Sequence, residues 1–236
     1  MIDNIASGGN LQFRNELKYE ISVGEIQMIR NRIRHLLLPD AHAGAEGQYS
    51  IRSLYFDDPF NRCFYENENG TDPREKFRIR IYNHSCERIT LECKRKEKGM
   101  TQKTACALTL EQAETLMAGH VLRDMDSQPP LLKKLTLQMM MKGLRPCVIV
   151  EYDREPFVYK TGNVRVTLDT NIASSNAIAR FFDERIPRRP VMPKGRQLLE
   201  VKYDELIPDF IFNNLQLENL QQTAFSKFYI CRKFSL

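Results

Sequence analysis

Apolar and polar residues alternate along much of the chain. The stretch EKFRIRIYN, residues 75–83, shows this best, because three apolar residues alternate there with three cations. A period of two places successive side chains on opposite faces of a β-strand, so one face of this strand is apolar and the other carries Lys76, Arg78 and Arg80. A water-exposed face would explain the cations of a single strand. The recurrence of the pattern in other segments favours a different interpretation.

Six further segments alternate in the same way and are predicted to be strands. They are residues 13–21, 50–58, 88–99, 147–157, 163–170 and 197–205. Several carry cations on one face and apolar residues on the other, and acidic residues recur two positions before a cation, as in Glu16 and Lys18. Because the pattern recurs, the charged faces of these predicted strands need one common explanation.

Four segments have helical periodicity, and each carries an apolar stripe that needs a surface to cover. In the first, Ser22 and Glu25 have the spacing of a capping box, which predicts a helix start at Ser22. The segments are residues 22–38, 109–119, 129–143 and 210–230.

The composition fits one folded domain. Of the 236 residues, 42% are hydrophobic and 28% are charged. We expect a short disordered leader over residues 1–12 and a single domain over residues 13–236. No apolar run approaches the roughly 20 residues of a membrane-spanning helix. The start lacks the features of a secretory signal, and the six cysteines include no CxxC pair, so we expect a soluble, cytoplasmic protein with reduced thiols.

A net charge of +5 indicates an anionic partner. Nucleic acid is not expected, because the longest basic run, KRKEK, is interrupted by Glu97. The Pro-rich segment 185–195 with its arginines is expected to be a solvated loop. Asp57 and Asp58 are expected to end a strand before Pro59.

The cationic faces are best explained by a closed barrel. Helices would cover the apolar outside, and the charged faces would line the interior. Cations enclosed in this way need an anion or metal-bound carboxylates, since uncompensated buried charge is expensive. The inward cations would be Lys18, Arg78, Arg80, Lys94, Arg154, Arg165 and Lys202. The predicted fold is α+β, with an antiparallel closed β-barrel tunnel of about eight strands walled by helices.

Arginine in this number favours phosphate as the anion. Its planar fork can hold two phosphate oxygens at once, whereas lysine acts as a point charge. The chain has neither a GxxxxGK[ST] loop nor a GxGxxG fingerprint, so its phosphate site is not a P-loop or a Rossmann turn.

An ordered set of segments resembles the VTC-type polyphosphate polymerase domain of the triphosphate-tunnel (CYTH-like) superfamily. Any one segment is weak, but the set runs in the family's order from about residue 13 to the end of the chain. The segments are RNELKYEI, SLYFDD, KFRIRIY, LECKRK, VEYDRE, VRVTLD, LLEVKYD and FSKFYI.

The resemblance implies an ATP-dependent enzyme that transfers the γ-phosphate of ATP onto a growing polyphosphate chain, with ADP as the other product. It implies Mn²⁺ or Mg²⁺ as cofactor, and ATP and polyphosphate as partners. With no membrane span of its own, the domain would need a separate membrane partner for any export. The oligomeric state is left open.

The resemblance also assigns residues by position. The catalytic phosphate-holding set would be Lys18, Arg78, Arg80, Lys94, Arg154, Arg165 and Lys227. The substrate-binding set would be Tyr152, Lys202, Ser226, Glu16 and Glu92, and the metal ligand would be Glu200. Glu16 and Glu92 have a second interpretation, as ion-pair partners that hold Lys18 and Lys94 in place. Asp169 is expected to pair with Arg165, with contact to a metal as the alternative.

Two other functions remain open at this stage. One is a metal-dependent tripolyphosphate or nucleoside triphosphate hydrolase of the same superfamily, and the other is a polyphosphate-binding module without catalysis. Tunnel hydrolases carry ExExK on the first strand, whereas this chain has RNELK, with Arg14 in place of the first acid. Arg14 therefore favours the polymerase over the hydrolase.

Overall fold

A computed structural model describes residues 14–41, 43–44, 46–124 and 126–235. The leader expected over residues 1–12 lies outside these residues. Eight strands follow one another in an antiparallel sheet in the order β1-β10-β8-β7-β3-β4-β5-β6. They are β1 (Asn15–Ser22), β3 (Tyr49–Asp57), β4 (Arg74–Tyr82), β5 (Ser85–Glu97), β6 (Met100–Leu108), β7 (Arg145–Tyr159), β8 (Val164–Ser175) and β10 (Arg196–Tyr203). Two short strands, β2 (Leu38–Pro39) and β9 (Arg189–Pro190), pair with β7 and β8.

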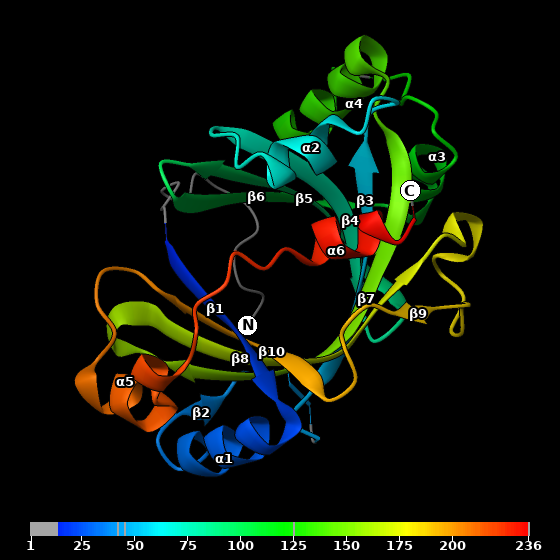
Figure 1. Ribbon diagram of the computed structural model, residues 1–236. Helices are drawn as coiled ribbons and strands as arrows, with labels where there is room; N and C mark the ends of the chain where they lie inside the picture. The colour runs from blue at the N-terminus through cyan, green and yellow to red at the C-terminus, as the bar shows by residue number, and fades with distance from the viewer. Residues whose placement is uncertain (1–13, 42, 45, 125, 236) are drawn as a thin grey trace.

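The sheet curls until its first and last strands meet. Arg14, just before β1, exchanges two backbone hydrogen bonds with Thr101 of β6, with N···O distances of 3.2 and 3.4 Å. Figure 1 shows the curled sheet with α6 (Lys227–Lys233) lying across its hollow side. The predicted antiparallel barrel of about eight strands is confirmed, in the form of a strongly curled sheet joined by one bridge.

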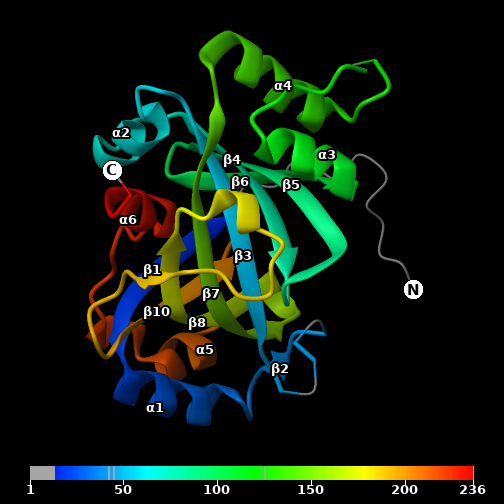
Figure 2. The same ribbon diagram turned by 90° about the vertical axis from the view of Figure 1, so that its right-hand side faces the viewer.

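Helices cover the outer, apolar side of the sheet at both ends of the molecule. Figure 2 shows α3 (Leu110–Met117) and α4 (Pro130–Lys142) at one end, and α1 (Val23–Ile33) and α5 (Asp209–Leu215) at the other. Ser22 and Glu25 form the predicted capping box at the start of α1. Among the described residues, no helix combines the length and the apolarity that crossing a bilayer requires.

The faces of the strands are oriented as predicted. Ile79 of β4 and Leu91 of β5 are fully buried in one cluster with Leu132 and Leu135 of α4. Since alternate residues point to opposite faces, Arg78 and Arg80 must point to the hollow side. Burial of the apolar face under helices therefore fixes the direction of the cations.

Besides the two-residue strands β2 and β9 and the 3₁₀ turns, one longer strand and one helix were not predicted from the sequence. In β6 the apolar residues do not alternate with the polar ones, and pairing with β5 along its whole length forms the strand instead. The short helix α2 (Arg62–Glu68) follows closely after β3. Asp57 and Asp58 lie at the end of β3, as expected. The Cys63 amide donates to Asp57 at 2.8 Å and the Arg62 amide donates to Asp58 at 2.9 Å.

The single helix predicted over residues 210–230 is wrong. The segment forms α5, a 3₁₀ turn and α6, separated by an extended stretch. In that stretch the Thr223 amide donates to the Lys18 carbonyl at 2.9 Å, and Gln222 forms a bridge with Tyr19. β1 is an end strand of the sheet, so its free backbone groups offer hydrogen bonds that compete with helix formation.

The loop between β8 and β10 is held by a buried ion pair on the outer face. Arg52 of β3 is only 1% exposed, and its Nε donates to Glu151 of β7 at 2.6 Å. Its other nitrogens donate to loop carbonyls, including that of Phe181 at 2.8 Å. Arg188 reaches the same carboxylate from an exposed position, at 2.8 Å.

We predict that Arg52→Met lowers the free energy of unfolding by about 3 kcal/mol, because it leaves the buried carboxylate of Glu151 with only half-buried His84 and exposed Arg188 as partners among the described residues. Arg188→Met, which removes the exposed partner, is expected to cost less than about 1 kcal/mol. Urea unfolding of both variants checks this. Equal losses would show that the loop does not depend on the buried pair.

Candidate functional site

A cavity of about 420 Å³ lies on the hollow side of the sheet, under the N-terminal end of α6. Ten cations and two carboxylates line it, so its wall carries a large excess of positive charge. The cations are Lys18, Arg74, Lys76, Arg78, Arg80, Lys94, Lys96, Arg154, Lys202 and Lys227, and the carboxylates are Glu16 and Glu200.

One wall of the cavity is built on Glu92 of β5. Two nitrogens of Arg78 contact its Oε2 at 2.6 and 2.8 Å, and Arg80 approaches the same atom at 3.5 Å. Burial alone would raise the pKa of Glu92, but the two guanidinium groups outweigh burial and hold this pKa well below its usual value. Tyr55 accepts a further hydrogen bond from Arg78 at 2.7 Å. Both arginines are thus held in fixed orientations.

The opposite wall is built on Asp169 of β8, which is fully buried. Arg154 of β7 donates to it twice, at 2.6 and 2.7 Å, and Lys227 of α6 lies 2.6 Å from the same carboxylate. Lys227 also lies over the ring of Tyr152, 4.7 Å from its centre. Burial raises the pKa of Asp169, but Arg154 and Lys227 more than compensate and lower it. Asp169 therefore ties α6 to the sheet.

The expected pair between Asp169 and Arg165 is wrong. Arg165 contacts Asp40 at 2.8 Å and the hydroxyl of Tyr49 at 3.0 Å. Arg154, which lies directly opposite Asp169 in the register of β7 and β8, takes the place expected for Arg165. Arg165 lies four positions before Asp169 on the same strand, about 13 Å away at the rise of a strand, whereas facing residues on neighbouring strands lie about 5 Å apart.

The floor of the cavity joins β1 and β10 through two carboxylates. Glu16 lies 2.7 Å from Lys94, and Glu200 accepts from Arg154 at 3.0 Å and lies 3.3 Å from Lys202. The two carboxylates are also close enough for each to influence the pKa of the other. Among the described residues, Glu16 Oε1 has no hydrogen-bond partner although it is buried. This pair of acids is the most anionic point of the cavity wall.

Comparison of the sequence with known protein families identifies the family of the chain. The family described as the VTC domain matches residues 13–236, which include every strand of the sheet. The chain belongs to the VTC domain family. The family predicted from the sequence is confirmed.

This VTC domain is similar to solved structures, and one of them, with a TM-score of 0.53, supports its fold. A Hippeastrum protein, described as having a dominant triphosphatase activity, is 12% identical with a TM-score of 0.53, and the match covers 95% of this chain and 97% of that one. The PH1819 protein from Pyrococcus horikoshii is 14% identical with a TM-score of 0.49, over 94% and 99% of the two chains. No curated protein matches the chain.

The VTC domain brings most of the predicted site residues together. Eleven of them line the cavity, namely Lys18, Arg78, Arg80, Lys94, Arg154, Lys227, Tyr152, Lys202, Ser226, Glu16 and Glu200. Glu92 lies directly behind this lining, and its partners are Arg78, Arg80 and Lys103 rather than Lys94. Glu16 does contact both Lys18 and Lys94, at 3.5 and 2.7 Å. Arg165 is outside the lining, and a role for it in binding stays a prediction.

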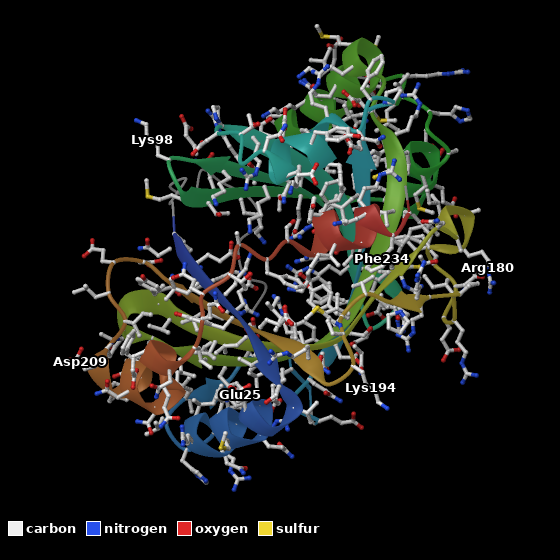
Figure 3. The ribbon with its side chains drawn as sticks, in the orientation of Figure 1. Glu25, Lys98, Arg180, Lys194, Asp209 and Phe234 are labelled. Carbon is white, nitrogen blue, oxygen red and sulfur yellow. The ribbon has the colours of Figure 1, made fainter. Side chains whose placement is uncertain are left out.

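Several lining residues of the VTC domain were not predicted. Lys76 and Lys96 continue the cationic faces of β4 and β5; the alternation placed Lys76 on one face with Arg78 and Arg80, but neither lysine was assigned to the site. Asn67 of α2 and Phe225 before α6 line the cavity too, and no pattern in the sequence indicated them, because they come from segments outside the strands. The Pro-rich segment 185–195 is solvent-exposed at Lys194, which Figure 3 shows at the edge of the molecule.

Proposed function

We propose that this VTC domain is an ATP-dependent polyphosphate polymerase, in which the terminal phosphate of a polyphosphate chain attacks the γ-phosphate of ATP. The excess of ten cations over two carboxylates on the cavity wall carries the proposal. Such a wall suits a linear polyanion, because each phosphate brings charge that the wall lacks.

The residues supply what phosphoryl transfer needs. The transition state spreads negative charge over the oxygens of the transferred group, and catalysis comes from positioning and charge stabilisation. Arg78 and Arg80 lie on one wall, while Arg154 and Lys227 lie on the other. Their carboxylate partners hold them before substrate binds, so little reorganisation is needed.

The step balances without a general base. An ionised oxygen of the chain end forms a bond to the γ-phosphorus, the bond from that phosphorus to the bridging oxygen breaks, and ADP leaves with the electron pair. No proton has to be removed from the nucleophile. This agrees with a wall in which cations predominate, and with Arg14 being held by Asp204 at 2.8 Å outside the cavity lining.

Glu16 and Glu200 would hold a divalent cation. The described residues contain no group of three or more His, Cys, Asp or Glu side chains suited to a metal. Mg²⁺ and similar ions commonly use one or two protein carboxylates and complete their shell with phosphate oxygens and water. Glu16 Oε1 accepts no hydrogen bond from the described residues and has the Lys202 ammonium 3.5 Å away, and its position beside Glu200 fits that arrangement. When bound, the ion would supply charge neutralisation on the phosphate oxygens.

Incubation of the purified protein with ATP and Mn²⁺ tests the proposal. Long-chain polyphosphate together with ADP is the expected product. Orthophosphate without polymer would assign the domain to the hydrolases instead. Tight binding of tripolyphosphate without turnover would make it a binding module.

A further inference from the structure

Lys76 differs from Arg78 and Lys94, its neighbours in the cavity, in making no ion pair with a carboxylate of the described residues. Its ammonium hydrogen-bonds to Asn67 of α2 and lies 3.5 Å from the hydroxyl of Ser226, the N-cap of α6. It also lies 4.8 Å from the centre of the Phe228 ring. Among the described residues, no carboxylate pairs with it, whereas Arg78 and Lys94 each contact a glutamate.

The charged groups around Lys76 are mostly cations. On β4 the nearest are Arg74 and Arg78, and on β5 Lys94 lies directly opposite Lys76, next to Lys96. Lys18 faces it from β1, and Lys227 follows Ser226 on α6. Acidic groups come from α2, through the thiol of Cys63 and the carboxyl of Glu66, and from β1, where Glu16 is already paired with Lys94 and Lys18.

This setting disfavours a charge on Lys76 in the absence of substrate. Shielding from water is the largest cause, followed by Arg74, and together with the other cations they lower its pKa to about 7. Cys63 cannot offset them as an anion near neutral pH, because burial keeps the pKa of its thiol far above that range. At pH 7 about half of Lys76 is therefore a neutral amine that lines the cavity, and the neutral fraction grows as the pH rises.

We propose that Lys76 is a phosphate-binding residue that becomes charged when the anion arrives, so that binding of a polyphosphate chain takes up a proton. The proposal rests on the proposed function, since it requires the cavity to bind phosphate. The lone pair of Nζ accepts a proton from the solvent, and no bond of the phosphate chain breaks. The ammonium then donates to phosphate oxygens. Their negative charge is the partner that the protein itself does not provide for Lys76.

Calorimetric titration with tripolyphosphate tests this directly. Binding is measured at pH 7.5 in two buffers of different ionisation enthalpy, which gives the number of protons taken up. About three quarters of Lys76 is neutral at that pH for a pKa near 7. The wild-type protein should therefore take up at least half a proton more than Lys76→Arg, whose guanidinium is always charged.

The pH dependence gives a second readout. At pH 6 Lys76 is already charged, so the difference in proton uptake should vanish and the two affinities should agree within about threefold. Above pH 7 the wild-type affinity should fall more steeply, by up to tenfold more per pH unit. Lys76→Gln should lose both affinity and the extra proton, while Lys133→Arg on α4 serves as a control without effect.

Clear outcomes would overturn the inference. Equal proton uptake by wild type and Lys76→Arg, with both binding tripolyphosphate, would show that Lys76 is charged beforehand or does not meet the anion. Unchanged affinity of a folded Lys76→Gln variant for tripolyphosphate would show that Lys76 does not meet the anion. Failure of the wild-type protein itself to bind tripolyphosphate would overturn the proposed function as well.

Discussion

Arg80→Ala is expected to reduce the rate of polyphosphate synthesis by about 10³-fold or more, while the fold remains intact. Arg80 is 6% exposed and contributes to the cavity wall, so its guanidinium can meet the transferred group away from bulk water. Loss of an arginine that stabilises phosphoryl transfer typically costs about 10³-fold to 10⁵-fold in rate. Arg78→Ala is expected to have an effect of the same order, for the same reason.

The fold should survive because Glu92 keeps other partners. Without Arg80, this carboxylate still contacts Arg78 and Lys103. Arg95→Ala is the matched control, since Arg95 lies on the neighbouring strand, outside the cavity lining, and pairs with Glu97. Initial rates at saturating ATP, with circular dichroism to verify folding, give the comparison. A folded Arg80→Ala protein with the wild-type rate would contradict the assignment.

Glu200→Gln is expected to lower the synthesis rate by about 100-fold and to shift the Mn²⁺ concentration for half-maximal rate upward by at least tenfold. The side chain keeps its size but loses the charge that suits a hard cation. The wall should persist, because Arg154 remains bound to Asp169 through two hydrogen bonds. Titration of activity against Mn²⁺ separates the two effects.

The matched control for this prediction is Glu155→Gln. Glu155 is also an acid on the sheet, but it pairs with Arg30 of α1 at 2.7 Å, away from the cavity. A Glu200→Gln protein whose rate falls with an unchanged Mn²⁺ midpoint would remove Glu200 from the metal site. Its role would then be to position Arg154 and Lys202.

The direction of the cations could be predicted from the sequence, because it depends only on the period of a strand and on the burial of apolar residues. Ile79 and Leu91 have to be covered by helices, and this leaves Arg78 and Arg80 only the hollow side.

Most of the ion pairs could not be predicted, because they depend on the register between strands; the predicted contact of Glu16 with Lys18 on one strand is an exception. Residues two positions apart on one strand point the same way but lie about 7 Å apart, whereas facing residues on neighbouring strands are closer. Glu92 faces Arg78 in the register of β4 and β5, so it pairs there rather than with Lys94. Only the register between β4 and β5 shows that Glu92 pairs with Arg78.

The end of the chain was mispredicted for a related reason. Helical periodicity over residues 210–230 is a local signal, and the free edge of β1 is a feature of the assembled sheet. Thr223 pairs with that edge, and the break it causes places Ser226 as the N-cap of α6 over the cavity. The error in the helix prediction therefore falls at the site itself.

The cations of these strands converge in one cavity, and we expect them to hold a single linear phosphate chain there. A crystal structure of the protein with tripolyphosphate provides the test. We expect one extended anion between Arg78 and Arg80 on one side and Arg154 and Lys227 on the other. A chain bound on the outer surface, with those four side chains still engaged only by their carboxylates and ring partners, would contradict it.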